Sequence, residues 1–161
     1  MDDKLTRLVN RFFRILHISV AERTVTGLVQ FIKFGLIGAT NTIISYVLNI
    51  LVLLFLEPFD VSWDFIAGNV VAFVLSVLWS FYWNNKLVFI VKGGESRPIL
   101  KTLMKTYLAY GFTGIVLSNL LSYLWINVLS VSKYVAPLLN LIISVPLNFV
   151  INKKWAFKDK T

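Results

Sequence analysis

Long apolar runs alternate with short polar segments along most of the chain. Four of these runs are long enough, or nearly so, for a helix to cross a hydrocarbon core of about 30 Å. They cover approximately residues 34–56, 65–83, 107–129 and 134–151. The pattern predicts an all-α integral membrane protein with four transmembrane helices joined by short loops.

Residues 4–19 precede the first run and carry a different pattern, with basic side chains placed between apolar ones at helical spacing. The apolar positions are Leu5, Leu8, Val9, Phe12, Phe13 and Leu16, and the basic ones are Lys4, Arg7, Arg11 and Arg14. Such spacing predicts an amphipathic helix that lies in the membrane interface and anchors the chain. We therefore expect an N-terminal cytoplasmic or interfacial segment (1–29) and a transmembrane domain (30–161).

A ten-residue motif closes both the second and the fourth apolar run. Residues 80–89 return 68 positions later as residues 148–157, so that Phe81 matches Phe149, Asn84 matches Asn152, Lys86 matches Lys154 and Phe89 matches Phe157. The first and third runs also open alike, each with a glycine pair behind a lysine. This repeat predicts two tandem hairpins of the same orientation, related by an axis along the membrane normal.

The two glycine pairs are Gly35/Gly38 and Gly111/Gly114, each three residues apart. Small residues let helix backbones approach closely in lipid. We therefore expect these glycines to lie at helix–helix contacts.

The basic residues predict how the chain is oriented. All of the 16 Lys and Arg residues except Lys133 lie before the first run, between the second and third, or after the fourth. The positive-inside rule then places both termini and the middle loop in the cytoplasm. The net charge of +8 is explained by this orientation, so we expect no nucleic-acid partner.

The amino-acid composition limits the metal sites and catalytic groups that the chain can form. The chain is 57% hydrophobic, contains no cysteine and has one histidine, His17, which lies outside the apolar runs. Thiol chemistry and cysteine-ligated metals are thereby excluded, and a histidine site is disfavoured. We expect no metal, no cofactor and no enzymatic activity, because no nucleophile–base or metal constellation is visible.

Polar residues recur at helical spacing within every apolar run. The candidate ligand-binding residues at depth are Asn41, Asn69, Asn140 and Asn148, accompanied by serines on the same faces, among them Ser45, Ser76, Ser118 and Ser144. One interpretation is interhelical hydrogen bonding. The other is a neutral, hydroxyl-rich ligand such as a sugar, because amides both donate and accept hydrogen bonds.

The cytoplasmic ends of the second and fourth runs gather amides and cations. The candidates there are Asn84, Asn85, Lys86, Asn152, Lys153, Lys154 and Trp155. Interfacial Trp and Lys are ordinary membrane anchors. Because the cluster is duplicated, phosphate binding is an equally weighted interpretation.

The closing motif resembles that of the GtrA-like family of small four-helix membrane proteins. The residues that fit are Asn148, Phe149, Asn152, Lys153, Lys154, Trp155 and Phe157, whereas the first copy departs from the pattern at Ser80, Asn85 and Leu87. The opening Lys33-Phe34, with Gly38 and Thr42, also resembles the family's first helix. The similarity covers about residues 30–157.

The resemblance implies a role in bacterial envelope glycosylation. It implies movement of an undecaprenyl- or other polyprenyl-phosphate-linked monosaccharide from the inner to the outer leaflet of the bacterial cytoplasmic membrane, for teichoic acid or another surface polysaccharide. The implied partners are that lipid, membrane lipids and a polyprenyl-phosphate glycosyltransferase. The alternative is a non-transporting scaffold for such a transferase. We also expect a homo-oligomer, since small bundles commonly associate.

Overall fold

The computed structural model describes residues 2–61, 64–90, 97–131 and 135–158. These residues are almost entirely helical and contain no strand, which confirms the all-α prediction. The α-helices are α1 (Asp2–Ile15), α2 (Glu22–Leu56), α3 (Asp64–Trp83), α4 (Ile99–Gly111), α5 (Ser118–Tyr123) and α6 (Ala136–Ile151). Lys92, Lys133 and Lys160, which are among the basic residues that predict the orientation of the chain, lie outside the described residues.

Shorter helical turns extend or interrupt these helices. A 3₁₀ turn over Glu57–Phe59 (η1) ends α2. The other four are π-helical: Asn84–Val88 (η2), Phe112–Leu117 (η3), Leu124–Val128 (η4) and Asn152–Ala156 (η5). Because η3, α5 and η4 follow α4 without a break, they form one long helix with it.

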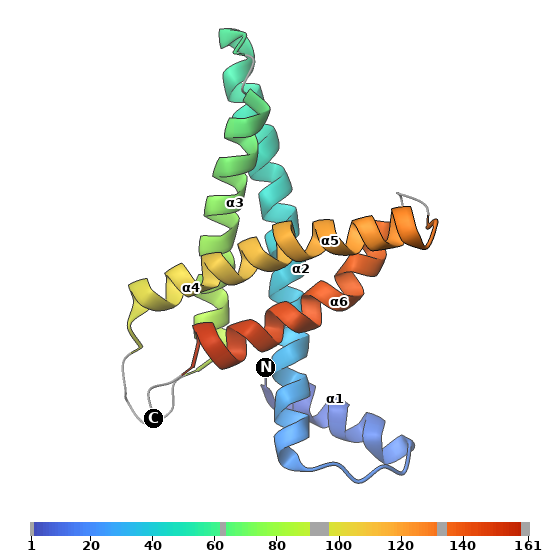
Figure 1. Ribbon diagram of the computed structural model, residues 1–161. Coiled ribbons are helices and arrows are strands. Elements are labelled where there is room, and N and C mark those ends of the chain that lie inside the picture. The colour runs from blue at the N-terminus through green and yellow to red at the C-terminus, as the bar shows by residue number, and fades with distance from the viewer. Residues whose placement is uncertain (1, 62–63, 91–96, 132–134, 159–161) are drawn as a thin grey trace.

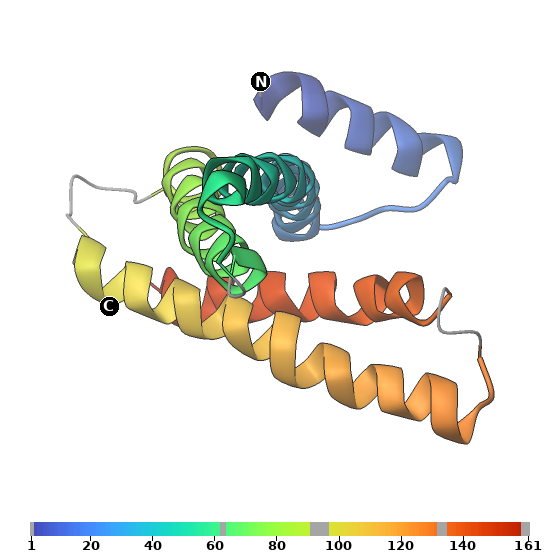
Figure 2. The same cartoon turned by 90° about the horizontal axis from the view of Figure 1, so that it is seen from above.

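The helices form two antiparallel pairs that cross each other (Figures 1 and 2). The first pair is α2 with α3, and the second is the long helix from α4 to η4 with α6. Two helical segments of the described chain, Glu22–Phe59 and Ile99–Val128, are long and apolar enough to cross a membrane. Each pair contributes one of them. The described helices thus form two pairs, whereas two tandem hairpins of the same orientation in a membrane stay a prediction.

The first long helix begins earlier than its apolar run indicates. Helix α2 is 35 residues long and begins at Glu22, so the segment boundary expected between residues 29 and 30 falls inside one continuous helix. Helix α1 packs against this early part of α2 through Val9, Val25 and Val29, all buried. The amphipathic N-terminal helix therefore places part of its apolar face on protein.

The two closing motifs meet in the main core of the molecule. Ring centroids lie 5.7 Å apart for Phe81 and Phe157, 6.0 Å for Phe89 and Phe149, and 4.5 Å for Phe89 and Phe157. Since Phe81 matches Phe149 and Phe89 matches Phe157 in the repeat, each residue contacts the partner that two-fold symmetry requires. The halves are therefore joined by a pseudo-symmetric contact that the repeat itself encodes.

The backbone of the two motifs is also the same. The N–H of Phe89 donates to the carbonyl of Asn84, and the N–H of Phe157 donates to the carbonyl of Asn152, each over 2.8 Å. Both bonds close a π-helical turn, a feature frequent at functional sites. The duplicated sequence thus produces a duplicated local structure.

A lysine from the neighbouring helix caps each of these ends. Lys33 donates to the carbonyl of Leu87 and Lys105 to the carbonyl of Trp155, each over 3.0 Å. Leu87 and Trp155 occupy matching positions in the repeat. The last carbonyls of a helix lack intrahelical partners and carry partial negative charge, which a cation satisfies. These lysines fix the opening of each pair to its closing end.

The aromatic contact yields a stability prediction. Phe157→Ala should destabilise the protein by about 3 kcal/mol, because it removes a buried ring that touches both Phe81 and Phe89. Phe55→Ala is the matched control, since Phe55 is 71% exposed. Thermal unfolding in detergent measures both variants. Equal, small effects would show that the aromatic contact does not hold the pairs together.

Candidate functional site: a polar groove between the two helix pairs

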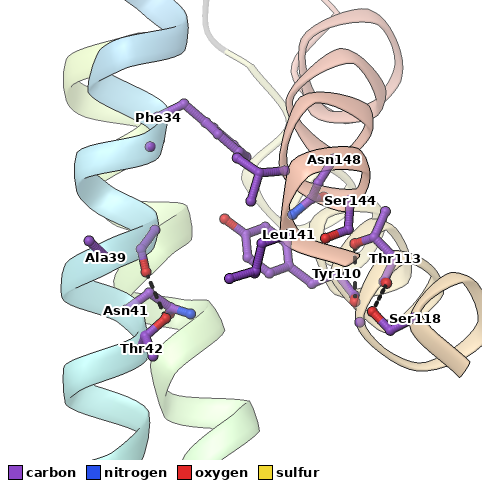
Figure 3. A pocket seen from close by; sticks show the side chains of 14 residues that line it. Phe34, Ala39, Asn41, Thr42, Tyr110, Thr113, Ser118, Leu141, Ser144 and Asn148 are labelled. Atoms are coloured by element: carbon purple, nitrogen blue, oxygen red, sulfur yellow. Dashed lines mark hydrogen bonds between the residues drawn. The ribbon is translucent and has the colours of Figure 1, made fainter. Parts of the chain in front are cut away.

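A groove of about 410 Å³ opens where the two helix pairs cross. Helix α2 forms one wall, and the long helix together with α6 forms the other (Figure 3). Its lining residues are Phe34, Gly35, Gly38, Ala39, Asn41, Thr42, Tyr110, Thr113, Gly114, Ser118, Leu141, Ser144, Val145 and Asn148. The groove therefore belongs to both halves of the repeat.

Amides and hydroxyls supply the polar surface of this groove. Asn41 and Thr42 face it from α2, and Ser144 and Asn148 face it from α6 (Figure 3). The Asn148 oxygen accepts a hydrogen bond of 2.8 Å from Asn152, and the Asn148 nitrogen is turned toward the groove (Figure 3). No charged side chain is among the described residues of the lining. Such a surface suits a neutral, hydroxyl-rich group.

Glycines keep the groove open, and the packing role expected for them is wrong. A Cβ atom added at Gly35, Gly38, Gly111 or Gly114 would have nothing within 4 Å outside its own helix. Three of the four, Gly35, Gly38 and Gly114, line the groove. Their lack of side chains creates space at the helix crossing, where close contact was expected.

Hydrogen bonds join α3 to α4 at the pseudo-equivalent position on the other side of the crossing. The hydroxyls of Ser80 and Tyr110 share a hydrogen bond of 2.6 Å, and Tyr107 donates to the carbonyl of Val74 over 2.6 Å. In the repeat, Ser80 matches Asn148 and Tyr110 matches Phe34. Phenylalanine cannot make the corresponding hydrogen bond, so Asn148 and Phe34 line an open groove. A sequence difference between the halves thus leaves one side open.

A second groove continues the polar surface along the first helix pair. Its volume is about 460 Å³, and its lining includes Ser45, Asn49 and Asn69. Asn49 donates to Asn69 over 3.0 Å. Because Asn41 and Thr42 line both grooves, the polar surface is continuous from the crossing toward the far end of α2.

The four deep asparagines separate into two groups. Asn41 and Asn148 line the groove and Asn69 lines its continuation. Asn140, by contrast, donates to the carbonyl of Ser118 over 3.1 Å and to the hydroxyl of Ser122 over 2.7 Å, and it accepts from Trp125 over 3.1 Å. For Asn140 the structure favours interhelical hydrogen bonding.

Asn84 and Asn152 lie inside the junction of the closing motifs. Their side chains are 1% and 0% exposed. Asn84 donates to Ser80 over 3.1 Å, and Asn152 donates to Asn148. Neither side-chain oxygen has a hydrogen-bond partner within the described part of the chain. These residues support the groove wall and do not line it.

The predicted boundary cations stay on the exposed edge. Lys86 lies over the rings of Tyr82 and Trp83, and Lys153 lies over the ring of Phe149. Partial burial, and then repulsion by Arg23, lower the pKa of Lys153 below the ordinary lysine value.

The other boundary candidates serve the junction or face outward. Asn85 accepts a hydrogen bond of 2.8 Å from Arg97, and the Trp155 carbonyl accepts from Lys105. Lys154 is exposed. None of these boundary residues lines the groove.

Several groove residues were not among the candidate ligand-binding residues predicted from the sequence. Thr42, Tyr110, Thr113 and Ser144 all line it. Ser144 belongs to a recognised polar face, and Thr42 lies one position after Asn41. Tyr110 gave no usable signal, because an aromatic residue near a helix opening is typical of a membrane anchor.

The helical fold and the two long apolar helices are those of a membrane protein. A family comparison then places it: the chain belongs to the GtrA/DPMS transmembrane domain family, whose model matches residues 33–157. This confirms the resemblance that the closing motif indicated. No solved structure matches the chain significantly.

Two relatives carry the name cell wall teichoic acid glycosylation protein GtcA. The protein from Listeria monocytogenes serovar 1/2a is 29% identical over 133 residues, which cover 80% of this chain and 85% of the relative. A second one, from Listeria monocytogenes, is 28% identical over 126 residues, covering 76% and 81%. The similarity therefore extends over most of each chain.

The open space around the glycines gives a second prediction. Gly38→Ala and Gly111→Ala should each stabilise the protein by about 0.5–1 kcal/mol, because alanine favours a helix and meets no neighbour here. Thermal unfolding in detergent measures the change. Destabilisation by either substitution would restore the helix-packing role for that glycine.

Proposed function

We propose that this protein moves a polyprenyl-phosphate-linked monosaccharide from the inner to the outer leaflet of the bacterial cytoplasmic membrane. There the sugar would serve cell-wall or surface-polysaccharide glycosylation, as the names of the Listeria relatives indicate for those proteins. The observation that carries the proposal is the uncharged amide and hydroxyl groove shared by the two halves. The protein would act as a transporter, without catalysis.

The proposal includes four membrane-spanning segments and cytoplasmic termini. In each half the first long helix would cross the membrane outward. The second helix, α3 with η2 or α6 with η5, would bring the chain back to the cytoplasmic side. Because the pairs cross, both would be tilted in the bilayer. The helical segments Glu22–Phe59 and Ile99–Val128 have 38 and 30 residues. A helix perpendicular to the membrane needs about 20 residues to cross it, so both segments are long enough to cross at a tilt.

The groove chemistry supports a sugar as the group that crosses. Its volume of about 410 Å³ falls in the usual range of ligand pockets, about 300–1,000 Å³. Sugar hydroxyls need partners that donate and accept, and Asn41, Thr42, Ser144 and Asn148 provide both. The polyprenyl chain would stay in lipid beside the open groove, so a closed channel is unnecessary.

Phosphate would be collected at the cytoplasmic edge. Arg23, Lys153 and Lys154 are near that edge in the proposed topology, and a cation near the surface contributes roughly 1 kcal/mol to binding an anionic lipid. An inside-negative potential favours outward movement of the phosphodiester charge by roughly 2.3 kcal/mol per 100 mV. This potential supplies a driving force if the charge crosses without compensation.

The alternative is a scaffold that positions a polyprenyl-phosphate glycosyltransferase. One observation favours this alternative: the names of the relatives specify glycosylation and do not mention transport. Under it, the groove would hold a partner helix. The two hypotheses differ in whether the purified chain moves lipid by itself.

Reconstitution tests the transport hypothesis. Vesicles containing the purified chain should accelerate transbilayer movement of a polyprenyl-phosphate-hexose, measured by accessibility of the sugar to an external probe. Gly38→Leu should reduce this rate by about tenfold or more. The leucine side chain would occupy part of the groove and leave less room for the sugar. Gly111→Leu is the matched control, since Gly111 is equally uncrowded but does not line the groove.

Two outcomes would contradict transport through the groove. The first is that the wild-type chain does not move the lipid in vesicles, although deleting its gene blocks glycosylation in cells. This outcome would favour the scaffold hypothesis. The second is that Gly38→Leu and Gly111→Leu, at equal expression, both move the lipid at the wild-type rate.

The boundary cations give a separate kinetic prediction. The double substitution Lys153→Gln with Lys154→Gln should raise the half-saturating lipid concentration by about fivefold or more, because two surface cations are lost. The maximal rate should change little, since neither lysine lines the groove. Lys158→Gln is the control, being another exposed lysine of the same terminus. An equal effect of the control would mean that only overall charge matters.

A further inference from the structure

A third cavity lies beneath α1, on the side of α2 away from the second helix pair. Figure 2 shows α1 on one side of α2 and the helices α4 to α6 on the other. The cavity has a volume of about 290 Å³, and its lining residues are Thr6, Thr26, Val29, Gln30, Lys33, Leu87, Val88 and Ile90. None of them lines the groove at the crossing, so the two spaces are distinct.

Two hydrogen-bond donors, the buried Lys33 and the half-buried Gln30, form part of the cavity wall. The Lys33 side chain is only 5% exposed, and its ammonium donates to the Leu87 carbonyl over 3.0 Å. The Gln30 amide donates to the Val88 carbonyl over 3.3 Å. An ammonium has three donor hydrogens and an amide has two, so both groups can make more than one hydrogen bond. The carbonyls thus fix both donors beside the cavity.

The lining is electrostatically one-sided. It contains the Lys33 cation, and the described lining residues include no carboxylate. Thr6 comes from α1, which carries the basic residues Lys4, Arg7, Arg11 and Arg14 and the acidic residues Asp2 and Asp3, and so is basic on balance. A cavity lined by a cation, an amide and hydroxyl groups suits an oxyanion, and a phosphate ester has this chemistry.

In the proposed membrane placement, the cavity lies at the depth of lipid phosphates. Lys33 immediately precedes the first apolar run, and Leu87 and Val88 lie at the end of the second. The cavity therefore lies at the edge of the apolar band, and α1 is an amphipathic helix of the kind that lies in this plane. This step uses the proposed membrane placement but does not require that the protein transports anything.

We propose that this cavity binds the phosphate group of an anionic membrane lipid. The bound phosphate would contact Lys33 and Gln30 on α2 together with Thr6 on α1. It would thereby hold α1 against α2 through polar contacts, in addition to the apolar contact of Val9 with Val25 and Val29. The site would be separate from the one that carries the cargo sugar.

Lipid-dependent thermal unfolding of the purified full chain in detergent tests the site. Phosphatidylglycerol should raise the unfolding temperature, while phosphatidylcholine and inorganic phosphate at equal concentration should not. Lys33→Gln should require about tenfold more phosphatidylglycerol for the same shift, because a hydrogen bond to a charged group is lost. Lys101→Gln, which removes the same charge from an exposed position on α4, should behave as wild type.

A second variant covers the case in which Lys33→Gln does not fold. Gln30→Glu keeps the side-chain shape but adds a negative charge to the cavity, so the phosphatidylglycerol shift should disappear. Asn10→Asp is its control, because Asn10 is an exposed position on α1 and the change adds the same charge.

Three results would overturn the assignment. The first is an equal response to inorganic phosphate, which would make the ligand a free anion. The second is equal weakening by Lys33→Gln and Lys101→Gln, which would reduce the effect to overall charge. The third is an unchanged phosphatidylglycerol shift in Gln30→Glu. Because none of these measurements uses transport, failure here is distinguishable from failure of the proposed function.

Discussion

The contact between Phe89 and Phe157, with the flanking pairs to Phe149 and Phe81, is the constraint on which the arrangement of the two halves depends. The rings follow π-helical turns that end each closing motif, and Lys33 and Lys105 cap the same ends. Aromatic pairs add geometric preference to burial. The junction therefore fixes both how far apart the helix pairs lie and how they cross.

The groove follows from this junction together with two departures from symmetry. Glycines occupy the positions of α2 and the long helix that face the crossing, so the walls stay apart. Tyr110 hydrogen-bonds to Ser80, whereas the matching pair of Phe34 and Asn148 makes no such bond and lines open space. Polar groups exposed in hydrocarbon are costly unless paired. Most of the deep amides and hydroxyls therefore face the groove or hydrogen-bond to a neighbouring helix.

The sequence predicted the helices, the repeat and the polar faces, because apolar length, motif spacing and helical period are local properties. Asn41 and Asn148 were correctly expected to face a common space, and this also holds for Ser118 and Ser144. The role of the glycines was predicted wrongly, since a missing side chain permits either close packing or a cavity, and only the crossing geometry decides. Burial of Asn84 and Asn152 inside the junction also depends on which motif meets which, a long-range property that no local pattern encodes.

The central claim is that a ligand crosses between the halves through the groove. The chain contains no cysteine, so a pair introduced as Gly38→Cys on α2 and Ser144→Cys on α6 would be its only thiols, one on each wall. Bridging them with a short, reducible bifunctional reagent, and measuring transbilayer movement of polyprenyl-phosphate-hexose before and after reduction, tests the claim directly. The account predicts that bridged protein does not move the lipid and that reduction restores movement. Full-rate movement with the walls bridged would contradict it.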